Sequence, residues 1–260
     1  MVRAASDDAP EIAIEVIDLT KRFGDVAAVK GISFRVPRGM VFGLVGPNGA
    51  GKSTTVKMLT TLLAPSSGTA RVAGFDVRQS PVAVRRRIGY VPQMQSADPD
   101  LTGFENLLVF ARLYALPRAS RRQRILDALH AMDLDDARDR LARHYSGGML
   151  RRLEIAQSLL NEPDVLFMDE PTIGLDPLAR HSVWERVGHL RSAHGTTIFM
   201  TTHYMDEAAE LCTRVAFMRE GRIVAEESPE TISGRYGADV TLDDLFIRYT
   251  GGNASQPAER

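Results

Sequence analysis

The sequence predicts an α/β fold in which an antiparallel β region leads into a parallel core, with a helical region inserted into that core. Near the N-terminus, apolar and polar residues alternate strictly, which is the period of a half-buried strand. Later, short and continuously apolar runs of strand length recur, as is typical of buried parallel strands. Between those runs, over about residues 94–160, apolar residues recur at helical spacing.

The antiparallel region is predicted from two alternating segments. They cover residues 12–16 and 32–36, and a turn at 21–24 separates them. A second turn at 37–39 then leads into the first continuously apolar run, at 40–45. A hairpin therefore precedes the first strand of the parallel core.

Three elements are expected between the first core helix and the central helical region. We predict a short strand at 69–73, a solvated helix face carrying the charge run 85–87, and a buried strand at 88–91. The last of these ends at Pro92-Gln93.

Two capping boxes support the prediction of a helical region over about 94–160. In this pattern a Ser or Thr side chain and a Glu or Gln three residues later satisfy each other's backbone N–H groups. The pattern fits Thr102-x-x-Glu105 and Ser120-x-x-Gln123, each of which precedes a helix-period apolar face.

The parallel core resumes after this helical region. Asp176 followed by Pro177 predicts an N-cap and the first turn of a helix, and Thr241-x-x-Asp244 predicts the start of a final helix. The expected buried strands are 164–170, 196–202 and 214–218.

Composition and termini limit the class of protein. The chain has 260 residues, a net charge of −1 and a single cysteine, Cys212. A bulk electrostatic nucleic-acid binder is therefore not expected, and Cys212 is interpreted as a small buried hydrophobe in a reducing compartment. The N-terminus lacks the apolar core of a signal peptide, and no run approaches the about 20 apolar residues of a membrane span. We expect residues 1–10 to be a disordered lead, residues 249–260 a disordered tail and residues 11–248 one domain.

A phosphate-binding loop is predicted between the apolar run at 40–45 and the helix that follows it. Glycines let the backbone approach a phosphate closely, and several N–H groups at the start of a helix can converge on the anion. A lysine can then reach the β- and γ-phosphates, while a serine hydroxyl ligates Mg²⁺. The motif consists of Gly46, Pro47, Asn48, Gly49, Ala50, Gly51, Lys52, Ser53 and Thr54.

Three further polar positions follow predicted buried strands. Because the carboxyl ends of parallel strands meet at one edge of a sheet, the pair Asp169-Glu170 is expected to face the same edge as Lys52. One carboxylate can hold Mg²⁺ and the other can orient and deprotonate a water. His203 follows the next strand and can donate to a γ-phosphate oxygen. The alternatives are a helix cap for the acidic pair and an ordinary surface histidine.

A second anion site is predicted at Ser146-Gly147-Gly148. Ser146 can cap the helix that follows, and the two glycines expose its first N–H groups. Because one phosphate loop already exists, the second site is interpreted as serving the nucleotide of another subunit. The alternative is a simple capped helix after a tight turn. Phe23 is a candidate for stacking on adenine, or else a rim residue beside a turn.

In their order along the chain, these motifs resemble the ATP-binding subunits of ABC transporters, over roughly residues 11–248. This resemblance implies a P-loop NTPase (RecA-like) core, with an antiparallel β subdomain and an inserted α-helical subdomain at about 94–160. It implies ATP and Mg²⁺ as ligands, bound by the phosphate loop with Lys52, Ser53 and Thr54. The other implied roles are adenine stacking by Phe23, magnesium sensing and coupling by Gln93, metal support by Asp169, water polarisation by Glu170, γ-phosphate contact by His203, and contacts across a dimer by Asp176, Ser146, Gly147 and Gly148.

Two positions depart from the usual Leu-Ser-Gly-Gly-Gln signature of the family, namely Tyr145 and Met149. Met149 cannot supply an amide hydrogen bond, although the backbone function of Ser-Gly-Gly remains. Tyr-Ser-Gly-Gly-Met followed by Leu-Arg-Arg-Leu-Glu is similar to the drug- and polyketide-exporter branch, the daunorubicin-resistance-like subunits. The implied partners are an integral-membrane permease and a second nucleotide-binding subunit, at the cytoplasmic face of the membrane, with no nucleic acid.

Other functions share parts of this pattern. A small-molecule kinase would have the phosphate loop but would not need Ser146-Gly147-Gly148 or His203. A soluble, non-transport ABC ATPase usually has duplicated cassettes, coiled coils or zinc-binding cysteines, none of which is found in this sequence. A purely regulatory nucleotide-binding module and an ABC importer subunit also stay open, and the transported cargo is not encoded here.

Overall fold

The computed structural model describes the backbone of residues 11–237 and 240–251, with all of their side chains except those of residues 191–194, 233 and 250. The predicted lead at 1–10 and most of the predicted tail lie outside these described residues. The start of the predicted tail is helical, because the last helix continues to Thr250.

The core is a six-stranded sheet with the strand order β10-β9-β3-β8-β7-β6. All pairs except β10–β9 are parallel. The three central strands are buried on both faces, which explains why their sequences are continuously apolar rather than alternating. The strands are β3 (Val41–Val45), β6 (Ile88–Val91), β7 (Val165–Asp169), β8 (Thr197–Thr202), β9 (Arg214–Arg219) and β10 (Arg222–Glu227).

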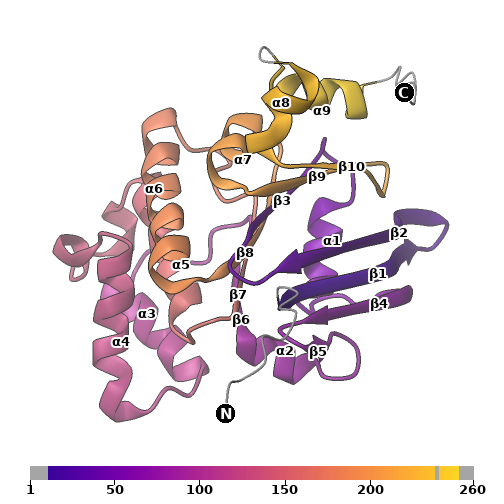
Figure 1. Ribbon diagram of the computed structural model, residues 1–260. Helices are drawn as coiled ribbons and strands as arrows, with labels where there is room; N and C mark the ends of the chain where they lie inside the picture. Colours follow the sequence, from indigo (N-terminus) through magenta and orange to yellow (C-terminus); the bar gives the residue numbers. More distant parts are fainter. Residues whose placement is uncertain (1–10, 238–239, 252–260) are drawn as a thin grey trace, which may run out of the picture.

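Alternate residues of these strands belong to two different hydrophobic cores. Phe42 and Leu44 of β3 point into one core, whereas Val41 and Val45 point into the other. Phe42 stacks on Phe199 of the neighbouring strand β8, with ring centroids 5.5 Å apart. The sheet thus separates the molecule into two layers, as Figure 1 shows.

A second, antiparallel sheet has the order β2-β1-β4-β5 and covers one layer. Its strands are β1 (Ile12–Phe23), β2 (Val26–Pro37), β4 (Ser67–Val72) and β5 (Phe75–Asp76). The predicted turn at 21–24 is wrong in extent, because β1 stays paired with β2 as far as Phe23↔Val26. Gly24, with φ +54°, supplies the left-handed conformation that such a short hairpin turn requires.

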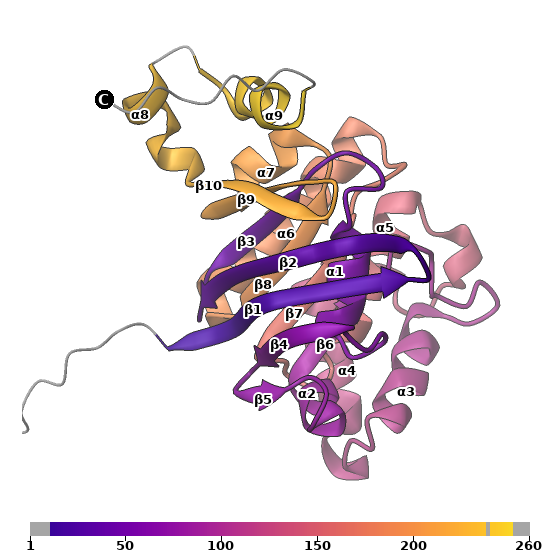
Figure 2. The ribbon, with the colours of Figure 1, turned by 90° about the vertical axis from the view of Figure 1, so that its right-hand side faces the viewer.

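Helices cover both faces of the six-stranded sheet. On the side of the antiparallel sheet lie α1 (Lys52–Leu59), which is sandwiched between the two sheets, and α2 (Pro81–Arg87) (Figure 2). The other side carries α5 (Gly147–Leu159), α6 (Pro177–His194) and α7 (Met205–Leu211). The helical region, with α3 (Gly103–Leu113) and α4 (Arg118–Ala131), packs against α5, with 3₁₀ turns at Asp135–Ala137 and Ala142–His144. The C-terminal elements are a 3₁₀ turn at Pro229–Thr231, α8 (Ile232–Tyr236) and α9 (Leu242–Thr250).

One of the two predicted capping boxes in the helical region is confirmed. Thr102 Oγ1 accepts a hydrogen bond from the Glu105 amide at 3.1 Å, and α3 begins at the next residue. The box at Ser120 is wrong. The helix α4 already begins at Arg118, directly after Pro117, whose fixed φ suits a helix start, and the Ser120 hydroxyl donates to the Pro117 carbonyl at 3.4 Å.

Candidate nucleotide-binding site

The phosphate-binding loop connects β3 to α1, and two of its glycines have no room for a side chain. A Cβ atom at Gly46 would lie 2.2 Å from the Met218 carbonyl oxygen, and one at Gly51 would lie 2.6 Å from the Ala28 carbonyl oxygen. Gly51 also has φ +109°, in the left-handed region. The loop residues 47–49 are exposed, so this part of the loop is open to a ligand.

The N-terminus of α1 provides donors for an anion. Among the described residues, no side chain caps this helix, so its first N–H groups and the positive end of the helix dipole remain available. Lys52, the first residue of α1, is 4% exposed, and its Nζ donates to the Gly46 carbonyl at 2.8 Å. The charge of Lys52 therefore lies against the loop, where a phosphate would bind.

Two hydroxyls converge on one oxygen of Asp169, the last residue of β7. Ser53 Oγ, in the first turn of α1, donates to Asp169 Oδ1 at 3.0 Å. Thr201 Oγ1, directly opposite on β8, donates to the same oxygen at 2.6 Å. Ser53 and Thr201, which are far apart in the sequence, thus donate to the same carboxylate oxygen.

The carboxylate of Glu170 lies among three nitrogen groups that come from three different segments. Its Oε1 is 3.4 Å from Lys52 Nζ, and its Oε2 accepts from Gln93 Nε2 at 3.3 Å. The ring nitrogen His203 Nδ1 lies 3.5 Å from the same Oε2. Glu170 is only 5% exposed and Lys52 only 4%, so the interaction between these two charges is little screened.

The backbone of Glu170 is in a conformation that a glutamate rarely adopts. Its φ is +49°, and its amide donates to Thr201 Oγ1 at 3.0 Å. Non-glycine residues with such angles cost on the order of 1–3 kcal/mol and persist only where the surrounding contacts impose them. The position of the carboxylate is thus imposed by the tertiary structure.

Burial shifts the ionisation of two groups next to this edge. Burial, with a contribution from the Asp169 charge, raises the pKa of Tyr90 to about 12. Burial also raises the pKa of Glu207, whose Oε1 accepts from Thr172 Oγ1 at 2.8 Å and Trp184 Nε1 at 3.0 Å. The buried Glu207 carboxyl group therefore fixes Thr172, in the segment that follows Glu170.

The structure does not bring the Ser146 segment to the phosphate loop of its own chain. The segment begins α5, which covers the opposite face of the sheet from α1. Ser146 Oγ accepts from the Met149 amide at 3.3 Å, as expected for a cap. Gly147 and Gly148 lie against the segment around Asp176, and a Cβ at Gly148 would be 3.0 Å from the Ala179 Cβ.

Asp176 and Phe23 also lie apart from Lys52 and Glu170. Asp176 Oδ1 accepts from the Ala179 amide at 3.0 Å, so it caps α6 as predicted. Phe23, at the end of β1, is 50% exposed, and Lys21 Nζ lies 5.2 Å from its ring centroid. The aromatic face is therefore accessible to a ligand.

The two residues that depart from the usual signature have contacts of their own. The Tyr145 hydroxyl donates to the Ala137 carbonyl at 2.7 Å, and burial raises the pKa of this tyrosine. The sulfur of Met149 lies 3.2 Å from Arg140 Nη2. Both side chains therefore fasten the start of α5 to the helical region.

Sequence reasoning missed two residues that contact the carboxylate pair or its backbone. Thr201 lies within the predicted strand 196–202, and a threonine at the end of a buried strand, just before His203, is a signal for a polar edge. Arg151 of α5 donates to the Glu170 carbonyl at 3.1 Å, and it is 6% exposed. Its signal is an Arg–Glu pair at i, i+3.

The donor set fits a magnesium–nucleotide complex. Ser53 and Asp169 present two oxygen ligands side by side, and the described part of the chain contains no cluster of three or more His, Cys, Asp or Glu side chains that would enclose a metal alone. Mg²⁺ commonly binds through one or two protein oxygens, with phosphate oxygens and waters completing its octahedron.

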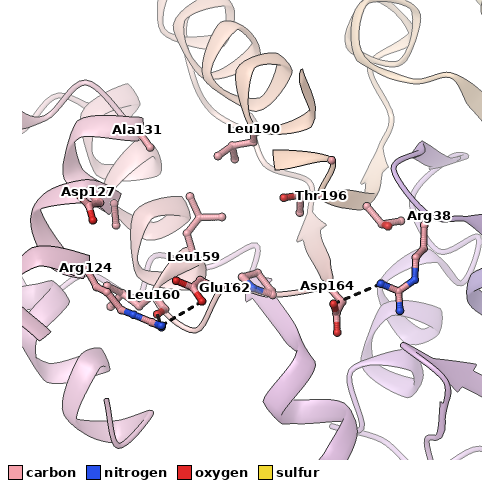
Figure 3. A pocket seen from close by; sticks show the side chains of 14 residues that line it. Arg38, Arg124, Asp127, Ala131, Leu159, Leu160, Glu162, Asp164, Leu190 and Thr196 are labelled. Carbon is pink, nitrogen blue, oxygen red and sulfur yellow. Dashed lines mark hydrogen bonds and ion pairs between the residues drawn. The ribbon is translucent and has the colours of Figure 1, made fainter. Parts of the chain in front are cut away.

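A cavity of about 620 Å³ lies elsewhere, at the opposite edge of the sheet, where β7 and β8 begin. Figure 3 shows two ion pairs among its charged side chains. Arg124 contacts Glu162 at 3.1 Å, and Arg38 contacts Asp164 at 3.6 Å. None of the predicted site residues lines this cavity.

Comparison with known proteins agrees with the geometry of the phosphate-loop edge. Residues 29–173 match the family model described as ABC transporter. The chain is 47% identical, over 96% of its length and 74% of the relative, to the daunorubicin/doxorubicin resistance ATP-binding protein DrrA of Streptomyces peucetius. It is also 47% identical, over 89% of its length and 76% of the relative, to the Nod factor export ATP-binding protein I of Paraburkholderia xenovorans.

Solved structures extend this likeness. An ATP-binding subunit of an ABC transporter superposes with a TM-score of 0.77 at 30% identity, covering 90% of this chain and 98% of that one. An ATP-binding cassette, solved as a dimer in a post-hydrolysis state with ADP and Pi, gives a TM-score of 0.74 at 25% identity, covering 83% and 98%. No helix within the described residues is long and apolar enough to cross a membrane.

Proposed function

Because the chain belongs to the ABC transporter family, as an ATP-binding subunit and ATPase, we propose that it drives a separate membrane permease which exports a drug-like or hydrophobic compound. The similarity to a drug-resistance protein and to Nod factor export proteins supports export over import. Under this proposal the subunit lies at the cytoplasmic face of the membrane, and the permease chooses the cargo.

The cluster around Glu170 is the observation that carries this proposal. Its carboxylate lies within 3.3–3.5 Å of Lys52, Gln93 and His203, although these residues are far apart in sequence. A buried carboxylate held in this position is suited to orient and deprotonate a water next to a phosphate. A simple helix cap would not need three converging nitrogen groups.

Each side chain at this edge has a role in the proposal. The N–H groups of residues 46–54 and Lys52 bind the phosphates, and Phe23 stacks on adenine. Ser53 and Asp169 hold Mg²⁺, with Gln93 beside them, and the metal supplies charge neutralisation at the phosphate oxygens. Glu170 polarises the water. The residues of the loop that we propose to bind the nucleotide are Gly46, Pro47, Asn48, Gly49, Ala50, Gly51, Lys52, Ser53 and Thr54.

His203 has a second ring nitrogen for the phosphate. Its Nδ1 faces Glu170 at 3.5 Å, which leaves Nε2 on the other side of the ring. We assign Nε2 as a donor to the γ-phosphate. The imidazole of His203 thus lies between the carboxylate that orients the water and the γ-phosphate.

A second copy of the chain completes the site. Ser146, Gly147 and Gly148 open α5 on the opposite face from α1, together with the segment of Asp176, so they are available to another subunit. The N-terminus of α5 then adds anion donors to the partner's ATP, and Asp176 bridges the two copies. Loss of phosphate removes the charge that both subunits bind, so the dimer opens and moves the permease.

The contact with the permease is proposed at Gln93 and the neighbouring helical region. Met94, next to Gln93, is 82% exposed, and Leu113 at the end of α3 is 73% exposed. A change at Gln93, which touches Glu170, can therefore be transmitted directly to the surface that a membrane partner would cover.

Affinity purification from native membranes tests the whole proposal. The subunit would be tagged, extracted in mild detergent, and its co-purifying proteins identified by mass spectrometry. We expect a polytopic membrane protein and no extracytoplasmic binding protein, with the tag alone as the control. Recovery only from the soluble fraction, with nucleic acid or ribosomes attached, would contradict the transporter proposal and leave the ATPase activity intact.

A further inference from the structure

Arg151 of α5 is a buried arginine whose every N–H group has an acceptor. Its Nε donates to the Pro171 carbonyl at 2.5 Å. Its Nη1 donates to the Pro92 carbonyl at 2.7 Å and to Glu154 Oε2 at 2.9 Å. Its Nη2 donates to the carbonyls of Asp169 at 3.4 Å and Glu170 at 3.1 Å. A guanidinium has five N–H donors, and all five are used here.

These contacts join two segments that carry proposed site residues. Pro92 immediately precedes Gln93, while Asp169 is the last residue of β7 and Glu170 and Pro171 are the two residues after it. The same guanidinium therefore fixes the segment of Gln93 relative to the backbone of Glu170.

Glu154, one helical turn after Arg151, holds the other end of the Gln93 segment. Its Oε2 pairs with Arg151, while its Oε1 accepts from the Ser96 amide at 2.5 Å. Glu154 is 3% exposed. Together, the two side chains bind residues 92–96 at both ends, so α5 fixes the loop that places Gln93.

The strained backbone of Glu170 is held from both sides. Its amide donates to Thr201 Oγ1 at 3.0 Å, and its carbonyl accepts from Arg151 Nη2 at 3.1 Å. Because φ +49° is unfavourable for a glutamate, removing one of these anchors releases strain and lets the carboxylate move. A carboxylate displaced by about 1 Å can cost on the order of 100-fold in rate.

We propose that the buried pair Arg151–Glu154 is a positioning unit for hydrolysis. The pair holds Gln93 and Glu170 at a fixed position relative to each other, and it connects both residues rigidly to the helix capped by Ser146. This inference rests on the proposed role of Glu170. In the proposed dimer, α5 touches the partner's nucleotide at its N-terminus and its own subunit's Glu170 three to five residues later. A shift of α5 on dimer closure therefore reaches the catalytic carboxylate of the same chain directly.

The chain offers a matched control in the neighbouring residue. Arg152 also donates to backbone carbonyls, those of Met132 at 2.9 Å and Asp133 at 3.1 Å, but these lie in the helical region after α4. A change at Arg152 removes comparable hydrogen bonds from the same helix without touching residues 92–96 or 169–171.

The test compares Arg151→Lys with Arg152→Lys in ATPase assays of the purified protein, together with any membrane partner that co-purifies. Lysine keeps the charge but supplies three donors from one point instead of a planar fork. We expect Arg151→Lys to lower kcat by about 10- to 100-fold with little change in KM for ATP, because the phosphate-loop contacts remain. Arg152→Lys should leave kcat within about twofold.

Hydrogen exchange supplies a readout that a merely structural role would not give. In Arg151→Lys, we expect faster exchange confined to residues 92–96 and 169–172, and no general increase. A wild-type kcat in a folded Arg151→Lys protein would overturn the inference, as would equal losses in both variants that follow their thermal stability.

Two further variants keep the result decisive. If Arg151→Lys does not yield folded protein, Glu154→Gln, which keeps the shape and one acceptor, is judged by the same split between kcat and KM. Glu170→Gln is assayed in parallel. If that variant turns over normally, the proposed role of Glu170 has failed; if it is inactive while Arg151→Lys is normal, only the present inference has failed.

Discussion

The two edges of the six-stranded sheet both carry charged residues, but the ion pair of Lys52 and Glu170 at one edge is buried, whereas the pairs at the other edge are partly exposed. At the carboxyl edge, Glu170 is 5% exposed and faces Lys52, Gln93 and His203. At the amino edge, the side chain of Glu162 is 72% exposed and pairs with Arg124 alone. A cavity of about 620 Å³ lies at the amino edge (Figure 3), and none of the residues around Glu170 lines it.

Chain direction explains the difference. The strands β3, β7 and β8 run parallel, so their carboxyl ends lead toward the starts of α1, α6 and α7, whose N–H groups attract anions. The amino edge receives the C-terminal ends of α5 and α6, where carbonyl groups prevail. The topology of the sheet therefore favours the carboxyl edge for the proposed anion site before any side chain is considered.

Among changes at the carboxyl edge, replacing Glu170 with glutamine should have the largest effect on ATP hydrolysis. The amide cannot accept the proton of the attacking water, so we expect hydrolysis to fall by about 10²–10⁴-fold while ATP binding persists. An ATP-dependent dimer should then accumulate, detectable by light scattering. Glu162→Gln, at the amino edge, is the control with unchanged turnover. Normal turnover by Glu170→Gln would remove that residue from its proposed role.

Removing the side chain of the buried Lys52 should weaken ATP binding and not only ATP hydrolysis. Lys52→Ala loses charge-assisted hydrogen bonds of about 1.5–3 kcal/mol each. We therefore expect ATP affinity to fall by about 10- to 100-fold, measured by calorimetry or by displacement of a fluorescent nucleotide. Lys57→Ala, on the exposed last turn of the same helix, is the matched control. Equal affinities for Lys52→Ala and wild type would contradict the phosphate-loop assignment.

At the amino edge, the Arg124–Glu162 pair should contribute little. Its side chains are 33% and 72% exposed, and exposed ion pairs contribute about 0–1 kcal/mol to the free energy of unfolding. A double-mutant cycle with Arg124→Ala and Glu162→Ala, followed by urea unfolding, should give a coupling within that range and no change in ATPase rate. A coupling several-fold larger, or a lost ATPase activity, would show that the two edges are not as different as proposed.

The smallest effect is expected at Cys212, which is buried beneath β3 between the two edges. Burial, with a lesser contribution from the Glu207 charge, raises the pKa of this thiol far above its usual range, so the reactive thiolate is scarce. The native protein should resist iodoacetamide at pH 8, whereas the urea-unfolded protein should react fully. Rapid labelling of the native protein, followed by mass spectrometry, would contradict this burial.

Local patterns predicted most of the elements and the candidate residues. The strand ending at Asp169, the phosphate loop at 46–54 and the cap at Thr102 all depend on neighbours within a few residues, so the sequence is sufficient to find them. The errors occurred where a local pattern competed with a second signal, either a neighbouring proline or strand pairing. Ser120 fits a capping box, but Pro117 starts the helix earlier. The turn expected at 21–24 gave way to pairing between β1 and β2.

The amino-acid sequence by itself determined that a phosphate loop, an acidic pair, a histidine and a Ser-Gly-Gly helix start are present in this order, because spacing and glycine content are written along the chain. Only the tertiary structure decided that Thr201 and Ser53 share one oxygen of Asp169, that Arg151 holds the backbone of Glu170, and that Ser146 lies on the far face from Lys52. These contacts join residues tens to more than a hundred positions apart. They depend on which strands lie side by side and how α5 packs on them, which no local period specifies.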